Sequence, residues 1–478
     1  MIAVKELNKV VPNFLQPGNL VLIKGYPGSG KTTLAATLCE HISMSRGRCV
    51  YISFQEDREK FLSNTTKLGL RLGALEREGM FRYVHLPITL DIEGFMRFVQ
   101  DDILQLMTPG SILVIDPINP AMRAVPGDAA KRAILQNFFA SLPRLTNSTV
   151  VLISEEPRIS EESLGDIDFV ADIILSMKYR LERGLLTRIL EIRKSRGAPT
   201  LVTEIPFSIR SITGLTLYPP VILSEIPPIS KETLSFPCKL LKSYIGQVHK
   251  GLVIYVTYPP DMRPREIPYL IFGLTALNNA RTLIISYRYP PDYIKTVFTR
   301  WLARDYGLPR PSVEELFDRH IIVESINPLS VSHTELMAKE LELIQATNPD
   351  IVMFHGTDIF PLLGLSDKNY VTNLFNMLQM LAGMGVLVVR DSAYVDDSWY
   401  RLGAALARVV FRFETDENGN LRTYIWRGGA KAIIVNEDQL HSCVDEIVDQ
   451  IAKKLRPVSP ITDEGLRESL RTNGHANQ

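Results

Sequence analysis

Short runs of apolar and β-branched residues alternate, in the first half of the chain, with longer stretches whose apolar positions recur at helical spacing. The runs lie at residues 19–23, 49–54, 111–116 and 149–153, and a helical pattern follows the first of them over residues 32–42. Continuously apolar strands separated by helices are typical of a buried parallel sheet covered on both faces. We therefore predict an α/β domain with a mostly parallel central sheet flanked by helices.

The second half of the chain repeats the order of the first. Residues 26–27, 52–56, 68–70 and 112–115 align in turn with residues 258–259, 285–289, 306–308 and 351–354. The offset drifts by only a few residues, as expected for two copies of one fold with small insertions. We predict a first domain over residues 1–218, a proline-rich linker over 219–234, a second domain over 235–455 and a polar tail over 456–478.

The composition is that of an ordinary globular protein, with 45% hydrophobic and 22% charged residues. Lys plus Arg equals Asp plus Glu, at 53 each, which argues against bulk electrostatic attraction to nucleic acid or membrane. The chain has no apolar run of about 18 residues and no signal-peptide pattern at its start. We therefore expect a soluble cytoplasmic protein whose four scattered cysteines are buried thiols.

The clearest chemical motif lies directly after the first strand. Residues 25–32 read GYPGSGKT and match G-x-x-x-x-G-K-[ST] at every fixed position. Glycines let such a loop wrap closely, so that backbone N–H groups and a helix N-terminus face phosphates. The sequence therefore predicts an ATP site. Its expected contacts are Gly25, Pro27, Gly28, Ser29, Gly30, Lys31, Thr32 and Thr33.

A magnesium site is expected beside this loop. In the motif, the lysine reaches the β- and γ-phosphates and the Thr32 hydroxyl binds Mg2+. Asp116 ends the apolar strand 111–116 and supplies the carboxylate that such a site needs. An Asp after a strand is often only a turn residue, but its company with the phosphate loop favours the role of a magnesium ligand.

Together these features resemble the KaiC branch of the RecA-type ATPases. Three further segments carry the resemblance: FQE at residues 54–56, where the family has Phe-Glu-Glu, FVAD at 169–172, and LEIRKSRG at 190–197, close to Leu-Glu-Ile-x-Lys-x-Arg-Gly. The resemblance covers the N-terminal half, and the second half resembles the second KaiC domain by position and pattern alone. It implies two tandem RecA-like P-loop NTPase domains.

The resemblance also implies a homo-oligomeric ring, typically a hexamer, with ATP between neighbouring subunits. In that picture Lys194 and Arg196 act in trans, placing positive charge against the γ-phosphate bound by the next subunit. Without the resemblance, both would be read as solvated charges at a strand end. The family's further nucleotide contacts fall on Ala198 and Thr200 here, and are not carried over.

Gln55 departs from the family pattern at the position that matters most for hydrolysis. It stands where the family has the first of two adjacent glutamates, which takes a proton from the attacking water, and an amide cannot act as that base. Glu56 follows, but adjacent residues of a strand point to opposite faces. Glutamine can still orient water, as in slow GTPases. We expect secure ATP binding with slow hydrolysis or none, with Gln55, Glu56, Lys194 and Arg196 as candidate catalytic residues.

The second domain has lost the phosphate motif. Residues 257–264 read TYPPDMRP where the first half reads GYPGSGKT, so all three glycines are absent, Arg263 replaces the lysine and Pro264 replaces the hydroxyl. His355 replaces Asp116. A loop with several prolines lacks the N–H donors of a phosphate nest. We predict a pseudo-ATPase domain with a structural or protein-binding role.

Three classes of function remain open. The leading hypothesis is a regulatory or assembly protein that switches with ATP, with slow turnover; kinase activity is not expected because it is associated with an intact second site. The first alternative is a DNA-acting relative of the RecA/RadA branch, which usually carries a helical DNA-binding domain before its core, and the motif beginning at Gly25 leaves no room for one. The second is a non-hydrolysing ATP-sensing scaffold, which Gln55 favours.

Overall fold

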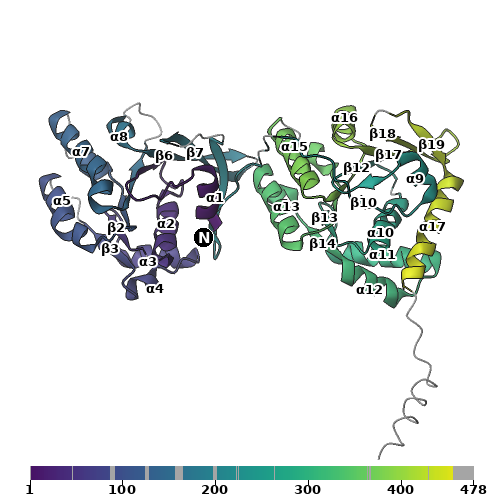
Figure 1. Cartoon of the computed structure of the whole chain (residues 1–478), viewed down its shortest axis with the longest axis horizontal. Helices are drawn as coiled ribbons and strands as arrows, with labels where there is room; N and C mark the ends of the chain where they lie inside the picture. Colours follow the sequence, from purple (N-terminus) through teal and green to yellow (C-terminus); the bar gives the residue numbers. More distant parts are fainter. Residues whose placement is uncertain are drawn as a thin grey trace, which may run out of the picture. The chain divides into compact units, whose positions relative to one another are not determined.

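The computed structural model divides the chain into two compact units, residues 1–220 and 221–478 (Figure 1). It describes residues 2–45, 47–86, 92–123, 129–156, 165–182, 184–197, 202–221, 223, 225–262, 264–362, 364, 368–428 and 430–455. Among these residues, no helix combines the length and the apolar character that crossing a membrane requires. The tail predicted over 456–478 lies outside the described residues.

The first unit is built on a nine-stranded sheet of order β3-β2-β4-β5-β1-β6-β7-β8-β9. The strands are β1 (Leu20–Gly25), β2 (Cys49–Ser53), β3 (Phe81–His85), β4 (Ile112–Asp116), β5 (Thr149–Glu155), β6 (Ile173–Glu182), β7 (Leu185–Ser195), β8 (Glu204–Arg210) and β9 (Gly214–Leu217). Strands β1 to β6 run parallel, and β6 to β9 form an antiparallel meander. Every residue of β1 and β2 is buried, which explains their uninterrupted apolar pattern.

Helices cover both faces of this sheet. They are α1 (Ile2–Val10), α2 (Lys31–Met44), α3 (Arg58–Lys67), α4 (Leu72–Arg77), α5 (Ile92–Phe98), α6 (Asn119–Arg123), α7 (Ala129–Thr146) and α8 (Gly165–Val170), with a π-turn at Val99–Ile103 and a 3-10 turn at Leu104–Leu106. Helices α1 to α4 pack in one hydrophobic core and α5 to α8 in the other. Alternate residues of β1 enter the two cores, with Val21 on one face and Leu22 on the other.

The second unit has an eight-stranded sheet of order β14-β13-β15-β16-β12-β17-β18-β19, which is the order of the first unit without its last strand. The strands are β12 (Val253–Tyr258), β13 (Thr282–Ser286), β14 (Ile321–Ser325), β15 (Ile351–His355), β16 (Leu387–Ala393), β17 (Val409–Thr415), β18 (Leu421–Arg427) and β19 (Ile433–Asn436), and a separate pair is formed by β10 (Thr233–Leu234) and β11 (Val248–His249). The sense of each pairing is also repeated. The prediction of two tandem α/β domains with mostly parallel sheets is confirmed.

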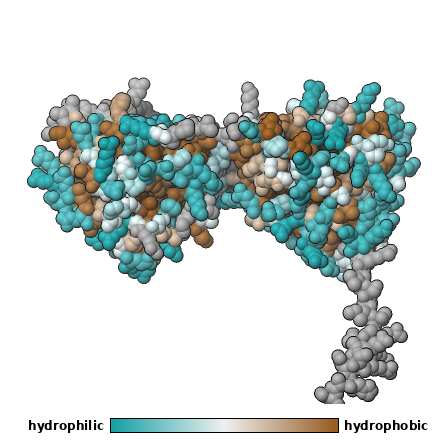
Figure 2. Space-filling model, in the orientation of Figure 1, coloured by the Kyte–Doolittle hydropathy of each residue, from teal (hydrophilic) through white to brown (hydrophobic). Residues whose placement is uncertain are grey.

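The helices of the second unit divide between two cores in the same way. They are α9 (Lys239–Ile245), α10 (Glu266–Asn278), α11 (Pro291–Tyr306), α12 (Arg310–His320), α13 (His333–Thr347), α14 (Ile359–Leu362), α15 (Lys368–Gly383), α16 (Asp397–Leu406) and α17 (Glu437–Leu455), with a 3-10 turn at Pro328–Ser330. Helices α9 to α12 and α17 share one core, and α13 to α16 share the other. On the face drawn in Figure 2, hydrophilic and apolar residues are mixed on both units.

The same pair of hydrogen bonds recurs at the equivalent turn of each unit. The Ser53 hydroxyl, at the end of β2, accepts bonds from the N–H groups of the second and third residues after it, at 3.3 and 3.1 Å. Ser286, at the end of β13, accepts the same two bonds at 3.4 and 3.0 Å. Each serine thereby fixes the turn that leads from its strand to the next helix.

The strand registers correct one detail of the sequence alignment. Gly25 pairs with the last residue of β5, and Tyr258 pairs with the last residue of β16. Gly25 therefore corresponds to Tyr258, whereas the alignment placed it opposite Thr257. The alignment of Asp116 with His355 agrees with the register, because each is the last residue of the strand beside β2 or β13.

The structure also differs from the prediction in where the linker ends. That segment was expected to end at residue 234, but Thr233–Leu234 forms β10 and pairs with Val248–His249 of the second unit. Glu232 also forms an ion pair with Lys250, at 3.0 Å. The end of the predicted linker is therefore part of the second unit.

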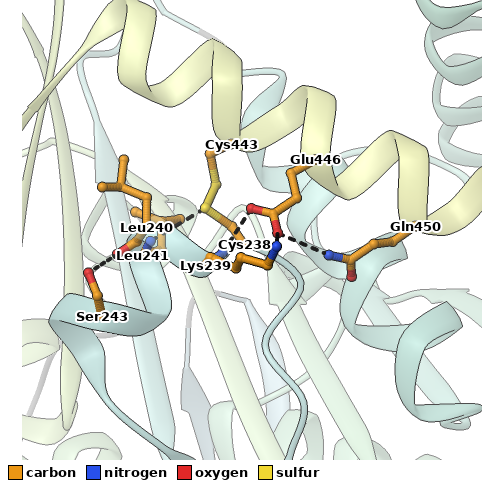
Figure 3. The surroundings of a disulfide bond; sticks show 8 residues. All are labelled: Cys238, Lys239, Leu240, Leu241, Ser243, Cys443, Glu446 and Gln450. Carbon is orange, nitrogen blue, oxygen red and sulfur yellow. Dashed lines mark hydrogen bonds and ion pairs between the residues drawn. A yellow bond between two sulfur atoms is a disulfide. The ribbon is translucent and has the colours of Figure 1, made fainter.

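The four cysteines form two disulfides, so the expectation of free thiols was wrong. Cys39 of α2 is joined to Cys49 of β2, and Cys238 to Cys443 of α17, each with a Cα–Cα distance of 5.3 Å. Figure 3 shows the second disulfide, where Glu446 accepts a hydrogen bond from the N–H of Lys239 at 2.9 Å. The pairs are distant or unpatterned in the sequence and meet only because helices pack against neighbouring elements.

Candidate functional site

The loop from β1 to α2 is held in a shape that requires glycine. Gly25 has φ 154°, and a Cβ there would lie 2.3 Å from the carbonyl oxygen of Met177. Gly30 has φ 104°, and its Cβ would lie 2.6 Å from Cδ1 of Ile209. A side chain at either position would meet both a strained backbone and an occupied space. The loop therefore fits tightly against β6 and β8.

This loop borders a polar cavity of about 570 Å3, within the usual range for a small-molecule site. The cavity lies where the sheet's parallel strands end, as ligand sites in α/β folds do. Its lining includes nine residues predicted from the sequence: Pro27, Gly28, Gly30, Lys31, Thr32, Thr33, Gln55, Glu56 and Asp116. It also includes seven that sequence reasoning missed: Tyr51, Ser53, Lys60, Phe61, Glu155, Arg188 and Ile209.

Two predicted loop residues lie behind the lining. Gly25 contributes its carbonyl oxygen, which accepts a hydrogen bond from Nζ of Lys31. Ser29 is fully buried, and its hydroxyl has no hydrogen-bond partner among the described residues. Neither residue therefore exposes a side chain to the cavity, and both act through the shape of the loop.

Lys31 lies at the start of α2 and is folded back onto its own loop. Its Nζ donates to the carbonyl oxygens of Gly25 and Tyr26, both at 3.0 Å, and the residue is only 6% exposed. Burial lowers the pKa of Lys31, while the negative charges of Glu155 and Asp116 act to raise it. A phosphate group would give the Lys31 ammonium a negatively charged partner, which two neutral carbonyl oxygens do not.

Thr32 and Asp116 meet across the cavity floor. The Thr32 hydroxyl donates to Oδ2 of Asp116 at 2.8 Å, and the Tyr51 hydroxyl donates to the same oxygen at 2.5 Å. Burial raises the pKa of Asp116, against the lowering effect of the Tyr51 and Thr32 hydrogen bonds. A hydroxyl and a carboxylate oxygen are ligands that Mg2+ takes, and the charge of the cation would oppose the effect of burial and favour the ionised carboxylate. These residues fit a nucleotide with magnesium.

Gln55 and Glu56 both line the cavity. The expectation that they point to opposite faces does not hold, because β2 ends at Ser53 and the alternation of a strand ends with it. Both belong to the turn fixed by the Ser53 hydroxyl. Oε1 of Glu56 accepts a hydrogen bond from Nδ2 of Asn64 at 2.9 Å.

Lys194 and Arg196 lie toward the other end of the strands from the phosphate loop. Lys194 pairs with Ile174, near the start of β6, whereas the phosphate loop follows the other end of the neighbouring strand β1. Nζ of Lys194 donates to the carbonyl oxygens of Asp168 and Phe169 at 2.8 and 3.0 Å, and Arg196 also donates to the latter at 2.8 Å. Neither residue lines the nucleotide cavity of the same chain.

Arg188 is the most informative residue that sequence reasoning missed. It lies in β7, lines the cavity, and its buried Nε has no hydrogen-bond partner among the described residues. Burial lowers its pKa. Arg188 and Ile209 reach the cavity because the meander of β7 and β8 extends the sheet beyond β6. No local motif reports such a pairing, and an arginine in a strand that mixes apolar and charged residues gives no distinct signal.

The corresponding place in the second unit has a different chemistry. The connection from Tyr258 to the first residue of α10, Glu266, contains three prolines and no glycine, and Arg263 lies outside the described residues. His355 occupies the position of Asp116, and its Nδ1 contacts Asp391 at 3.1 Å. Among the described residues, no group of three or more His, Cys, Asp or Glu side chains is arranged to hold a metal ion.

Comparisons with known proteins agree with the geometry of the first unit. A family model for the KaiC ATPase matches residues 2–221. The circadian clock oscillator protein KaiC of Parasynechococcus marenigrum is 25% identical over 194 residues, 38% of this chain and 35% of that protein. The protein of the same name from Parathermosynechococcus lividus is 23% identical over 207 residues, 41% of this chain and 36% of that protein.

A third relative, the circadian clock oscillator protein KaiC of Synechococcus elongatus, is 22% identical over 184 residues, 38% of this chain and 35% of that protein. The matched segment thus covers about a third of the length of these relatives. The family match, the loop geometry and the sheet order all concern the same segment. Residues 2–221 therefore form a domain that matches the KaiC ATPase family model and is consistent with a KaiC-like P-loop ATPase.

Proposed function

We propose that the first unit binds ATP with Mg2+ and hydrolyses it slowly, as a regulatory or assembly switch in a ring of identical subunits. One observation carries the proposal: the cavity joins a complete set of phosphate and magnesium groups to an amide, Gln55, at the place of the general base. The cavity thus has the groups needed to bind ATP but lacks a strong general base to hydrolyse it.

The binding groups have distinct roles. Lys31 leaves its two carbonyl partners to bind the β- and γ-phosphates, and backbone N–H groups of the loop from Gly28 to Gly30 face the phosphate chain. Thr32 and Asp116 hold the magnesium ion, which neutralises negative charge on the phosphates when it is bound. These groups position the nucleotide whether or not it is hydrolysed.

The hydrolytic groups are weaker. Gln55 can orient a water molecule through its amide but cannot accept the proton that the water loses. Glu56 can accept a proton, and it lines the same cavity. Its carboxylate is engaged by Asn64, at 2.9 Å, and must be released or shared to act as a base. Slow turnover follows from this arrangement.

The ring is supported by the position of Lys194 and Arg196. Neither residue lines the nucleotide cavity of its own chain, which supports a role at the γ-phosphate in the cavity of a neighbouring subunit. They flank Phe169, whose side chain is 76% exposed. A large exposed apolar side chain beside two cations suits a contact between subunits. Such a contact would bury the phenyl group of Phe169 and bring the two positive charges to a phosphate of the neighbouring subunit.

The second unit is proposed to bind no ATP and to serve as a pseudo-ATPase domain that binds a partner protein or stabilises the ring. The connection after β12 lacks the glycines of the first loop, and its three prolines have no amide donor. Titration of the full chain with ATP is expected to give one nucleotide per chain, and two per chain would contradict this role.

The deciding experiment measures phosphate release from Mg-ATP by the full chain, with Lys31→Ala as the blank. Turnover of the wild type above the blank, raised about tenfold or more by Gln55→Glu, supports a slow ATPase limited by its base. ATP binding with no release above the blank, in the wild type and in Gln55→Glu, would replace the enzyme with a non-hydrolysing scaffold. Glu56→Gln distinguishes the contribution of Glu56 to turnover from that of Gln55.

A further inference from the structure

The second unit contains a cavity at the place that the nucleotide cavity has in the first unit. It has a volume of about 140 Å3 and a mostly apolar lining. The lining comprises Tyr258, Pro264, Ile267, Pro268, Tyr289, Tyr293, Ile294, Val297, Phe298, Trp301, Met353, His355 and Asp391. Strand order and helix starts match its walls to those of the first unit: Glu56, Lys60 and Asp116 correspond to Tyr289, Tyr293 and His355. Polar residues have thus been exchanged for aromatic ones.

The walls are arranged to hold a flat ring. Tyr289 packs against Tyr293, with their ring centroids 4.9 Å apart, and against the imidazole of His355 at 5.9 Å with 30° between the planes. Tyr293, Val297 and Trp301 follow at intervals of four residues and so lie on one side of α11. Aromatic side chains around a cavity favour planar apolar ligands, through offset stacking and edge contacts.

One polar pair interrupts the apolar walls. Nδ1 of His355 lies 3.1 Å from both carboxylate oxygens of Asp391, which is 1% exposed. Asp391 also accepts hydrogen bonds from the Tyr258 hydroxyl at 2.9 Å and from the N–H of Gly356 at 3.0 Å. Burial raises the pKa of Asp391, but His355 and these two donors outweigh it and leave the pKa below its ordinary value. The carboxylate is therefore ionised near neutral pH.

The ionised carboxylate fixes the tautomer of the histidine. Because a carboxylate only accepts hydrogen bonds, Nδ1 carries the proton and Nε2 of the neutral ring is an acceptor. Nε2 has no hydrogen-bond partner among the described residues, and the side chain of His355 is 17% exposed where it lines the cavity. The cavity thus offers one acceptor within aromatic walls.

We propose that this cavity binds a small molecule of the phenol class, with its ring among Tyr289, Tyr293 and Trp301 and its hydroxyl donating to Nε2 of His355. The size agrees, because a cavity of roughly 150 Å3 with apolar walls holds one benzene ring. A single aromatic ring with one hydroxyl satisfies both the walls and the acceptor. A nucleotide is excluded by volume and by the loss of the phosphate loop.

The test uses the full chain labelled with 5-fluorotryptophan, since the chain has three tryptophans and only Trp301 lines the cavity. The 19F resonances are assigned with Trp→Phe variants. Titration with phenol is expected to shift the Trp301 resonance and to leave those of Trp399 and Trp426 unchanged. Toluene, which has the ring without the hydroxyl, is expected to bind about tenfold more weakly.

Two variants complete the test. His355→Asn keeps an amide donor for Asp391 but removes the acceptor of the ring, so phenol should bind it no better than toluene does. Val297→Trp fills the cavity and should abolish the response to both probes. Equal affinity for phenol and toluene, undiminished phenol binding by His355→Asn, or no response of Trp301 would each overturn the proposal. If Val297→Trp does not fold, His355→Asn alone tests the proposal. Neither measurement depends on ATP turnover.

Discussion

The Tyr51 hydroxyl and Oδ2 of Asp116 are 2.5 Å apart, and that oxygen is also the one bound by Thr32. Tyr51 is fully buried, and burial, followed by the charge of Asp116, raises its pKa well above the ordinary value. The hydroxyl therefore stays protonated and donates to the carboxylate throughout the physiological pH range. A protein group thus occupies part of the coordination capacity that a magnesium ion would use.

Replacement of Tyr51 by Phe is expected to strengthen magnesium binding. Without the hydroxyl, the cation displaces one hydrogen bond fewer from Asp116, which corresponds to a roughly three- to tenfold lower magnesium concentration for half-maximal ATP binding. The measurement is ATP binding as a function of magnesium concentration. Tyr83→Phe is the matched control, because Tyr83 stacks on Tyr51 but donates to the carbonyl of Glu56. Weaker magnesium binding in Tyr51→Phe would instead show that the tyrosine orients the carboxylate.

Two glycines of the phosphate loop should differ sharply in their tolerance of alanine. Gly25→Ala places a Cβ 2.3 Å from a backbone oxygen and is expected to destabilise the first unit by about 3 kcal/mol or more. Gly28 also has a positive φ, of 78°, but no atom lies within 4 Å of its Cβ position, so Gly28→Ala should cost only about 1–2 kcal/mol. Chemical denaturation of both variants measures the difference, and equal costs would contradict the tight fit against β6.

Mixing of two inactive variants should restore ATP turnover if Lys194 acts between subunits. Lys31→Ala removes the phosphate site of its own subunit, and Lys194→Ala removes the cation offered to the neighbour. In a randomly mixed ring, roughly a quarter of the interfaces combine an intact cavity with an intact Lys194. Turnover is measured before and after the two proteins are mixed and exchanged. A mixture as inactive as its components would refute the trans role, and mixing with Lys31→Ala/Lys194→Ala is the control.

Stability of the second unit is expected to depend on pH through Glu340. Burial raises the pKa of this carboxyl to about 7, although the hydrogen bond from Tyr287 acts to lower it. Because the folded pKa is raised, the stabilising contribution is complete below the ordinary pKa, near 4.5, and is lost as the pH rises through about 7. The free energy of unfolding should fall by roughly 3 kcal/mol over this range.

Glu340→Gln tests this dependence, because the amide keeps a partner for Tyr287 and cannot ionise. Denaturation of the second unit, followed at pH 5 and pH 8, should show a smaller difference in the variant than in the wild type. Glu342→Gln, on the exposed side of the same helix, is the control and should behave like the wild type. A wild-type unfolding free energy that is unchanged or rises with pH would show that Glu340 is not the titrating group.

The phosphate site was predictable because its parts are local. The residues from Gly25 to Thr33 are contiguous, and Asp116 ends a strand whose apolar pattern is unmistakable. Tandem repetition of the fold was predictable for a similar reason, since each apolar strand recurs at nearly the same spacing. Sequence patterns report such features because one short segment contains all the necessary information.

Other features depended on pairings between distant segments. Arg188 and Ile209 reach the cavity through the meander at the edge of the sheet, and Cys238 meets Cys443 across 205 residues of sequence. The orientation of Glu56 was misjudged because the end of β2, at Ser53, could not be located from a β-branched run that continues to Phe54. Tertiary contacts and exact strand ends decide these points.

The serine that ends β2 and the serine that ends β13 have a consequence for how the two cavities can differ. Ser53 and Ser286 hold their turns by accepting hydrogen bonds from backbone amides, contacts that do not depend on which side chains occupy the turn. A substitution in the turn can change what the cavity recognises without altering the path of the backbone. The same pair of backbone hydrogen bonds therefore supports Glu56 at the cavity of one unit and Tyr289 at the cavity of the other.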